Sequence, residues 1–310
     1  MKTTSDLFLG VDLGGTKIEA AIVNRAGEVI ARERVATPDG DYDATLHAIC
    51  RLCDRVQHQV GDEAPRPLGI GTPGSLSPES GLLRNCNSVA LNNRRLDRDL
   101  ERLSGRKVRM ANDADCLALS EAISGAGRPY STVFAVILGT GVGGSLVVAG
   151  KLLQGPNRIT GEWGHNPINR QRAKLANPAL AEPRLCYCGN VDCVETWLSG
   201  PGIAETHKRI HGNDVCIKQL GAAEPDESHS LTLDIYSEVL ASALASVINI
   251  VDPQAVVFAG GLSNVSKILR LAKQKLPTHV FSDTCRTELI VAEHGDSSGV
   301  RGAAFLWRDG

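Results

Sequence analysis

The sequence predicts an α/β protein built from two related halves. Its 310 residues are enough for two domains of about 100 to 200 residues each. Two apolar strands, over 7–12 and 132–138, each end in a glycine turn and are followed by a second strand-like run. A third glycine pair follows the β-branched run 255–259, and ligands of open α/β sheets bind at such strand ends. The two strand–turn–strand units are expected to face each other across a cleft.

Composition and charge argue against several classes of protein. Hydrophobic residues make up 42% of the chain and charged residues 22%, which is ordinary for a soluble globular protein. The formal net charge of -2 provides no basic field, so neither nucleic acid nor an anionic membrane is an expected partner. The apolar run 7–11 is too short for a signal peptide or a membrane span. A cytoplasmic location is therefore expected, where the nine cysteines would be thiols or metal ligands.

The first glycine turn has the composition of a phosphate-binding loop. Gly14 and Gly15 allow backbone amides to approach a phosphate, Thr16 and Lys17 can donate to it, and Asp12 can hold Mg²⁺ through water. The spacing is neither that of a Walker A loop nor that of a Rossmann fingerprint, since a strand follows the turn. Taken alone, such a hairpin is more often only a turn.

The segment that follows predicts helices and strands in alternation. Apolar spacing predicts a helix over 42–60, and residues 68–74 resemble a short strand that breaks into a turn. The amide side chains of Asn85, Asn87 and Asn92 suit sugar hydroxyls, although turn chemistry explains each of them singly.

A strand over 107–111 leads into Asn112 and Asp113, and a helix is predicted over 116–124. An aspartate beside a helix start is by default an N-cap. The same position suits the general base of a phosphotransferase, with Asn112 holding the accepting hydroxyl. The residues alone leave both interpretations of Asp113 open.

The second glycine turn, over 139–144, raises the odds of nucleotide binding. With the pair Gly260–Gly261, the chain contains three such turns on strand ends, which is more than coincidence explains. Apolar side chains at helical spacing over 236–251 predict a helix buried on one face, as core or as a subunit interface. A last helix, ending at Trp307, is expected to return to the first domain.

A histidine and three cysteines over 159–195 have the ligand types of a tetrahedral zinc site. Four candidate ligands indicate a closed, structural site rather than a catalytic one, whereas the alternative is a set of core thiols and a buried histidine. A bound metal would also bring Glu162 and Glu195 to one place, where they suit a polyhydroxylated ligand. The four candidate ligands are His165, Cys186, Cys188 and Cys193.

Together these motifs resemble the ROK family (repressors, open reading frames, kinases) of sugar kinases, within the actin-like ATPase superfamily. The resemblance covers essentially the whole chain. In the family a glycine immediately precedes the third cysteine, whereas this chain has Asp192, which is expected to strain the zinc loop without removing a ligand. The motifs are Asp12 to Lys17, Gly71 to Gly74, Asn112 to Ala114, Gly139 to Gly144, Glu162 to His165, Cys186 to Glu195, and Gly260–Gly261.

The resemblance implies a two-lobed actin-like ATPase (ribonuclease H-like) α/β fold with a nucleotide and sugar cleft between the lobes. The expected N-terminal lobe covers 1–114 and is joined by 297–310, and the C-terminal lobe covers 115–296 and contains the zinc loop. ATP with Mg²⁺ would contact Gly10, Asp12, Gly14, Gly15, Thr16, Lys17, Gly139, Thr140, Gly141, Gly143, Gly144, Gly260 and Gly261. The sugar would contact Gly74, Asn87, Asn112, Asp113, Glu162, His165 and Glu195, with Asp113 as the catalytic base. Structural Zn²⁺ would bind His165, Cys186, Cys188 and Cys193.

Within the family the chain looks closest to bacterial fructokinases of the manno(fructo)kinase type, through the motifs at 71–75, 85–88, 162–167 and 294–304. The expected reaction is therefore transfer of the γ-phosphoryl of ATP to the 6-hydroxyl of fructose. The alternatives are an N-acetylhexosamine kinase or a glucose or mannose kinase of the same family, a non-catalytic sugar sensor, and an actin-like or chaperone-like ATPase. A homodimer is expected.

Overall fold

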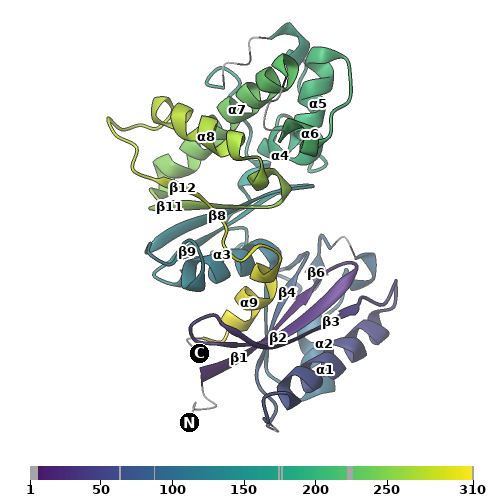
Figure 1. Cartoon of the computed structure of the whole chain (residues 1–310). Helices are drawn as coiled ribbons and strands as arrows, with labels where there is room; N and C mark the ends of the chain where they lie inside the picture. Colours follow the sequence, from purple (N-terminus) through teal and green to yellow (C-terminus); the bar gives the residue numbers. More distant parts are fainter. Residues whose placement is uncertain are drawn as a thin grey trace. The chain divides into compact units, whose positions relative to one another are not determined.

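The computed structural model describes residues 6–62, 64–86, 88–173, 175, 177–221 and 226–308. The chain forms two compact units (Figure 1). The first comprises the described residues of Met1–Pro129, Val147–Thr160 and Glu293–Gly310, and the second those of Tyr130–Leu146 and Gly161–Ala292. These units differ in extent from the lobes expected from the sequence, because residues 115–129, 147–160 and 293–296 belong to the first unit.

The first unit is built on a five-stranded sheet of order β3-β2-β1-β4-β7. The central strands are almost continuously apolar because both faces of the sheet are covered, whereas the edge strand β3 alternates buried and exposed residues. The strands are β1 (Leu7–Leu13), β2 (Lys17–Asn24), β3 (Val29–Ala36), β4 (Leu68–Thr72) and β7 (Val108–Asn112), with a small separate pair β5 (Ser75–Leu76) and β6 (Leu83–Arg84).

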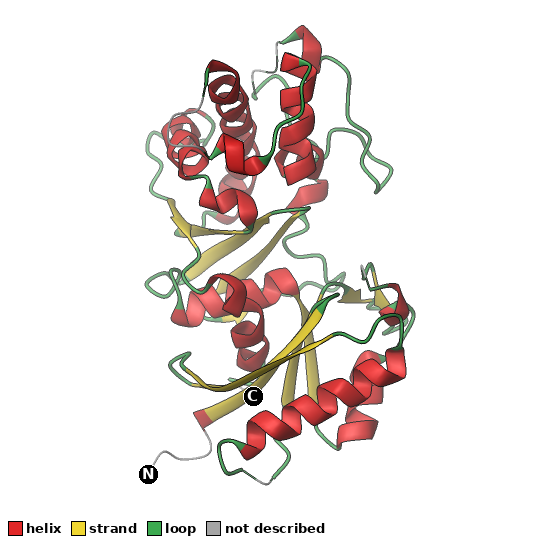
Figure 2. Ribbon diagram, turned by 45° about the vertical axis from the view of Figure 1, so that its right-hand side comes forward, coloured by secondary structure: helices red, strands yellow, loops and turns green. Residues whose placement is uncertain are grey.

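Helices cover both faces of this sheet (Figure 2). On one face lie α1 (Tyr42–His58) and α2 (Leu96–Ser104), and on the other α3 (Asp113–Ser124) and α9 (Ser298–Phe305). Helix α1 begins at the predicted residue, since the Asp41 side chain accepts from the amide of Ala44 at 2.9 Å and caps it. The C-terminal segment thus returns to the first unit, as expected for the helix that ends near Trp307.

The second sheet has the order β10-β9-β8-β11-β12. Its strands are β8 (Thr132–Leu138), β9 (Val142–Val148), β10 (Lys151–Leu152), β11 (Ala255–Ala259) and β12 (Glu288–Val291). In each sheet the two strands joined by the glycine turn are neighbours, β1 with β2 and β8 with β9. On the other side of β1 and of β8 come two parallel pairings, β1–β4–β7 and β8–β11–β12. The equal number and order of strands confirm the predicted α/β class and the relatedness of the two halves.

The helices of the second unit are α4 (Val194–Leu198), α5 (Gly200–His211), α6 (Ile217–Leu220), α7 (Glu227–Val251) and α8 (Ser266–Lys275). Helix α7 is long and apolar enough to cross a membrane by length and composition. However, 72% of its most apolar window is buried inside the protein, as expected of a core helix. The helix predicted over 236–251 is therefore confirmed as core, and it begins earlier, after the capping side chain of Asp226.

Candidate functional site

Three neighbouring strands of the first unit end at one edge of its sheet. Asp12 of β1 pairs with Gly71 of β4, and Thr72 of β4 pairs with Asn112 of β7, both in parallel register. Because the strands are parallel, their carboxyl ends coincide, and the residues after them lie close together. This edge brings the predicted residues Asp12, Asn112 and Asp113 to one place.

Asn112, rather than Asp113, caps helix α3. The Asn112 Oδ1 atom accepts from the amide of Asp115 at 2.6 Å, and Asp113 is the first helical residue. The Asp113 Oδ1 atom accepts from the amide of Ala114 at 2.8 Å, and burial raises the pKa of Asp113 above the usual carboxyl value. Asn112 is thus the N-cap of α3, and the role of Asp113 as a general base stays a prediction.

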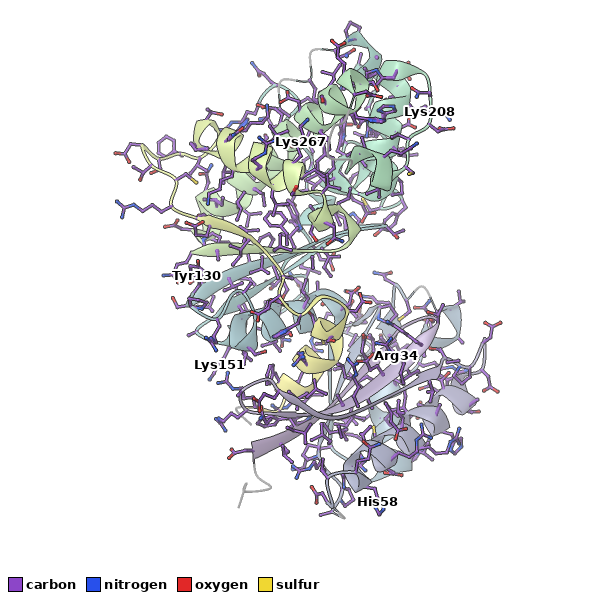
Figure 3. All side chains as sticks on the ribbon, viewed as in Figure 1. Arg34, His58, Tyr130, Lys151, Lys208 and Lys267 are labelled. Atoms are coloured by element: carbon purple, nitrogen blue, oxygen red, sulfur yellow. The ribbon has the colours of Figure 1, made fainter. Side chains whose placement is uncertain are left out.

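Asp12 lies near two other carboxyls, Asp113 and the buried Glu19. Burial, together with the nearby charges of Glu19 and Asp113, raises the pKa of Asp12 to about 6. Glu19 accepts from the Nε of Arg34, which is labelled in Figure 3, at 2.6 Å. Carboxylate oxygens at a partly open edge are the donors that Mg²⁺ prefers. The residues at this edge therefore fit a magnesium ion.

The first glycine turn is the tip of the β1–β2 hairpin. The last paired residues are Leu13 and Ile18, and the amide of Gly14 donates to the Lys17 carbonyl at 3.0 Å. Gly15 and Thr16 are exposed at this tip. Gly10 instead lies inside β1, where a Cβ would be only 2.3 Å from the Val300 carbonyl of α9. Close packing against a helix therefore accounts for Gly10.

A pocket opens in the first unit beside Asn112. Its wall combines apolar side chains with amide, hydroxyl and guanidinium groups. Two of the predicted sugar-binding residues, Gly74 and Asn112, line it, and Asp113 directly follows Asn112 in the chain. The lining residues are Thr72, Gly74, Ser75, Leu76, Met110, Ala111, Asn112, Asp115, Leu153, Gln154, Arg158 and Thr160.

Sequence reasoning missed one side of the pocket wall. Leu153, Gln154, Arg158 and Thr160 belong to a connection that has no motif of its own. The motifs at 71–75 and 112–114 indicated the other side, which includes Thr72, Gly74 and Asn112. One further signal lies in the backbone, because Arg158 has a φ of 52°, and such left-handed residues often occur at functional sites.

Two of the three predicted asparagines are explained by turn geometry. Asn92 accepts from the amide of Cys86 at 2.9 Å and donates to the Cys86 carbonyl at 3.0 Å. Asn85 has a left-handed backbone with a φ of 60°. Asn87, the predicted sugar ligand, lies outside the described residues.

The second glycine turn joins β8 to β9 in the second unit. Gly139, Thr140 and Gly141 form the turn itself, whereas Gly143 and Gly144 lie within β9. The amide of Gly139 donates to the Gly141 carbonyl at 3.0 Å, which closes the turn. The predicted turn is thus present, although its last two glycines have strand geometry.

The third glycine pair lies beside the start of this turn. Strands β11 and β8 are parallel, with Ala259 opposite Ile137. Gly260 follows with a φ of 88°, and a Cβ there would be 2.4 Å from the Leu138 carbonyl, so only glycine fits. Gly260, Gly261 and the turn of Gly139 therefore lie together at one edge of the second sheet.

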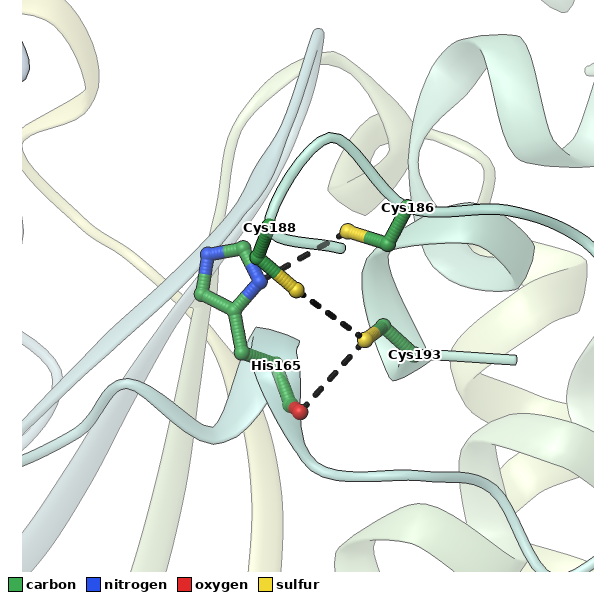
Figure 4. Close-up of side chains that lie close together, drawn as sticks. All are labelled: His165, Cys186, Cys188 and Cys193. Carbon is green, nitrogen blue, oxygen red and sulfur yellow. Dashed lines mark hydrogen bonds between the residues drawn. The ribbon is translucent and has the colours of Figure 1, made fainter. Parts of the chain in front are cut away.

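The four predicted metal ligands converge in the second unit (Figure 4). One ring nitrogen of His165 and the Sγ atoms of the three cysteines all lie within 4.8 Å of one another. The Cys188 and Cys193 Sγ atoms are 3.6 Å apart, and the Cys186 Sγ lies 3.7 Å from the His165 Nδ1. Ligands on a tetrahedral zinc with Zn–S bonds of about 2.3 Å would be about 3.8 Å apart. The donor set therefore fits a zinc ion in chemistry and in size.

Neighbouring groups orient these ligands. The hydroxyl of Tyr187 is 3.0 Å from the His165 Nε2, so the Nδ1 faces the sulfurs. Backbone pairing of Pro167 with Cys193 joins the segment of His165 to that of the third cysteine. The amide of Asn190 lowers the pKa of the Cys188 thiol to about 7, so the thiolate that a metal requires is available near neutral pH.

Asp192, where the family has glycine, has a left-handed backbone with a φ of 53° and is only 8% exposed. Its Oδ1 atom accepts from the amide of Arg184 at 3.0 Å and from the Trp197 Nε1 at 3.1 Å, and its Oδ2 pairs with Arg170 at 3.1 Å. These bonds offset the strain expected from the sequence.

We expect Asp192→Ala to lower the free energy of unfolding by about 3 kcal/mol, because alanine keeps the strained backbone and leaves the partners of the carboxylate unpaired. Asp192→Asn should cost less, since asparagine tolerates a positive φ and still accepts hydrogen bonds. Urea unfolding followed by tryptophan fluorescence measures both, and an alanine variant as stable as the wild type would contradict this account of the loop.

A model of the ROK family matches residues 8–310. An N-acetylgalactosamine kinase from Shewanella sp. (strain ANA-3) is 36% identical over 302 residues, covering 97% of this chain and 96% of its own length. An N-acetyl-D-glucosamine kinase from Haemophilus influenzae (strain 86-028NP) is 35% identical over 303 residues, covering 97% and 99%.

Solved structures agree on the fold. The ROK hexokinase from Thermus thermophilus has a TM-score of 0.82 at 25% identity, covering 98% of this chain and all of its own, which confirms the expected actin-like α/β fold. A ROK family transcriptional regulator has a TM-score of 0.80 at 22% identity, covering 97% of this chain and 77% of its own. The family model and the curated relatives each span nearly the whole sequence, and the chain therefore belongs to the ROK family, among its sugar kinases.

Proposed function

We propose that this protein is an ATP-dependent kinase of N-acetylhexosamines, and N-acetylglucosamine and N-acetylgalactosamine are its first candidate substrates. The observation that supports the reaction is the position of Asp113, directly after β7 and beside the sheet edge that fits Mg²⁺. The observation that supports the substrate is the identity of 35% and 36% to two N-acetylhexosamine kinases over nearly the full chain.

This proposal replaces fructose, which the sequence motifs favoured, by the alternative weighed beside it. An acetamido group presents a methyl group, an N–H donor and a carbonyl acceptor, whereas fructose offers only hydroxyls and the ring oxygen. The pocket beside Asn112 contains both kinds of partner, with Leu76, Met110 and Leu153 for the methyl and Gln154 for the amide. The pocket wall is thus compatible with an acetamido sugar.

In the proposed reaction Asp113 accepts the proton of a sugar hydroxyl, expected to be the 6-hydroxyl. The hydroxyl oxygen forms a bond to the γ-phosphorus of ATP while the bond to the β–γ bridging oxygen breaks, and ADP leaves with that electron pair. Asn112, which precedes the base, would orient the sugar. The amides of both glycine turns would stabilise the charge on the phosphoryl oxygens. Mg²⁺, held at the edge of Asp12, would supply further neutralisation of the phosphates when bound.

Zinc is proposed as a structural ion, because the four protein ligands complete its coordination. It would fix the loop that contains Glu162, His165 and Glu195, the predicted sugar ligands of the second unit. A homodimer and a cytoplasmic location stay predictions from the sequence.

The test is ADP release with MgATP across a panel of N-acetylglucosamine, N-acetylgalactosamine, N-acetylmannosamine, glucose, mannose and fructose. We expect kcat/KM to be at least about tenfold higher for one acetamido sugar than for the parent hexoses, because an unpaired polar group in a pocket costs about 1–3 kcal/mol. A reaction without sugar is the control for ATP hydrolysis. Fastest turnover with fructose would restore the motif-based interpretation, and turnover independent of sugar would favour an ATPase.

A further inference from the structure

The carboxylate of Glu195 is hydrogen-bonded to the second glycine turn. Its Oε2 atom accepts from the amide of Val142 at 3.1 Å. A Cβ at Gly141 would lie 2.9 Å from the same oxygen, so the carboxylate is packed against the turn backbone. Glu195 is thus a predicted sugar ligand whose carboxylate, in this structure, contacts the predicted phosphate turn.

The segments that contain the metal ligands meet the same turn from two directions. Glu195 lies two residues after Cys193, and the next helix begins at Gly200, whose amide donates to the Gly139 carbonyl at 2.7 Å. On the other side, Gly164 precedes His165 and approaches Val142 so closely that a Cβ would be 2.3 Å from its carbonyl. These contacts hold the backbone of the segment that contains Glu195 beside the turn.

A carboxylate is an unexpected neighbour for a turn that binds phosphate. It occupies the Val142 amide, a donor that a phosphate oxygen would otherwise use, and its charge repels a polyphosphate. Sugar hydroxyls are hydrogen-bond donors, and a carboxylate accepts from them strongly. A sugar whose hydroxyls donate to the Glu195 carboxylate would thereby free the amide of Val142.

We propose that Glu195 couples the two substrates: without sugar its carboxylate holds the amide of Val142 and disfavours nucleotide, and bound sugar draws it away from the turn. This inference rests on the proposed function for the identity of the sugar. It makes Glu195 a positioning residue for the phosphate turn as well as a sugar ligand. By linkage, nucleotide must raise the affinity for sugar by the same factor as sugar raises the affinity for nucleotide.

The experiment is calorimetric titration of the full chain with the magnesium complex of a non-hydrolysable ATP analogue, with and without saturating sugar. In the wild type, sugar should raise the affinity for the analogue by about 5- to 150-fold. Glu195→Gln removes the charge and keeps an acceptor, so the variant should bind the analogue at least about fivefold tighter than the wild type without sugar. The gain on adding sugar should then fall to less than about twofold.

A purely structural role predicts the opposite sign, since loosening the turn would weaken nucleotide binding. Glu195→Ala gives a second measurement should the glutamine variant fold poorly, and Glu205→Gln, whose carboxylate pairs with Arg209 on the surface of α5, is the matched control. Sugar coupling that persists in both Glu195 variants, or weaker nucleotide binding by them without sugar, would overturn the inference. Absence of acetamido-sugar phosphorylation by the wild type would instead overturn the proposed function, while the sugar-free titration would still test Glu195.

Discussion

Asp113→Asn is expected to lower kcat by about 100- to 10,000-fold, because the amide cannot accept the proton of the attacking hydroxyl. The KM for sugar should change much less, since asparagine retains hydrogen-bonding atoms at the same place. In the wild type, kcat should rise as the pH increases through the raised pKa of Asp113. The residual rate of the variant should not show this rise with pH. Steady-state rates from pH 4.5 to 8.5 measure both effects, and near-normal turnover would remove Asp113 from the role of base.

The same substitution should stabilise the protein at neutral pH. Burial raises the pKa of Asp113, so the folded chain holds this proton more tightly than the unfolded chain. The free energy of unfolding therefore falls as the pH rises from the ordinary carboxyl pKa through the raised value. The Asp113→Asn variant should have a higher melting temperature than the wild type at pH 7 and the same melting temperature near pH 3. Asp283 is exposed, and Asp283→Asn should change the melting temperature at neither pH. A variant that is both inactive and less stable at pH 7 would indicate damage to the fold.

Cys193→Ser should release the metal of the second unit. The apparent binding free energy of structural zinc is about 10–16 kcal/mol, and losing one thiolate ligand should weaken binding by more than about 100-fold. Elemental analysis of protein purified without chelator should find one zinc per chain in the wild type and less than about a tenth of that in the variant. The urea midpoint should fall as well, because Cys193 is fully buried where two segments pair.

Cys216→Ser is the matched control, since Cys216 is exposed and lies outside the group of four ligands. It should retain the zinc and the stability of the wild type. A wild-type protein with far less than one zinc per chain would refute the metal site, and a Cys193→Ser variant that kept its zinc would show that the other three ligands suffice.

The sequence predicted best those elements that are buried on both faces. The strands 132–138 and 255–259 have the predicted bounds, because a short, mainly apolar run that ends at a glycine has few other structures available. Helix α7 begins nine residues before the predicted 236, at Glu227, because its first turns are polar and only the capping residue Asp226 marks the start. Strand β3 gave no apolar signal, since charged residues occupy its exposed face.

For the site, motifs located the strand ends and the metal ligands but not the wall of the pocket. The four metal ligands could be predicted because a structural zinc site requires four Cys or His side chains, several of them closely spaced in the sequence. The pocket residues Gln154 and Arg158 belong to a connection that has no sequence motif, so no pattern identified them. The hydrogen bond from Val142 to Glu195 joins residues far apart in the chain, and no local pattern predicts such a bond.

The place of α9 has a consequence for how the first unit folds during synthesis. This helix packs on β1 at Gly10, and a Cβ at Gly299 would lie 2.6 Å from the Asp12 Oδ2. The residues that complete the surroundings of Asp12 thus follow the whole second unit in the chain. A ribosome will have released the second unit before the first can close its core, so the sheet edge at Asp12 is assembled last. Until then the strands of the first unit expose an apolar face that chaperones would recognise.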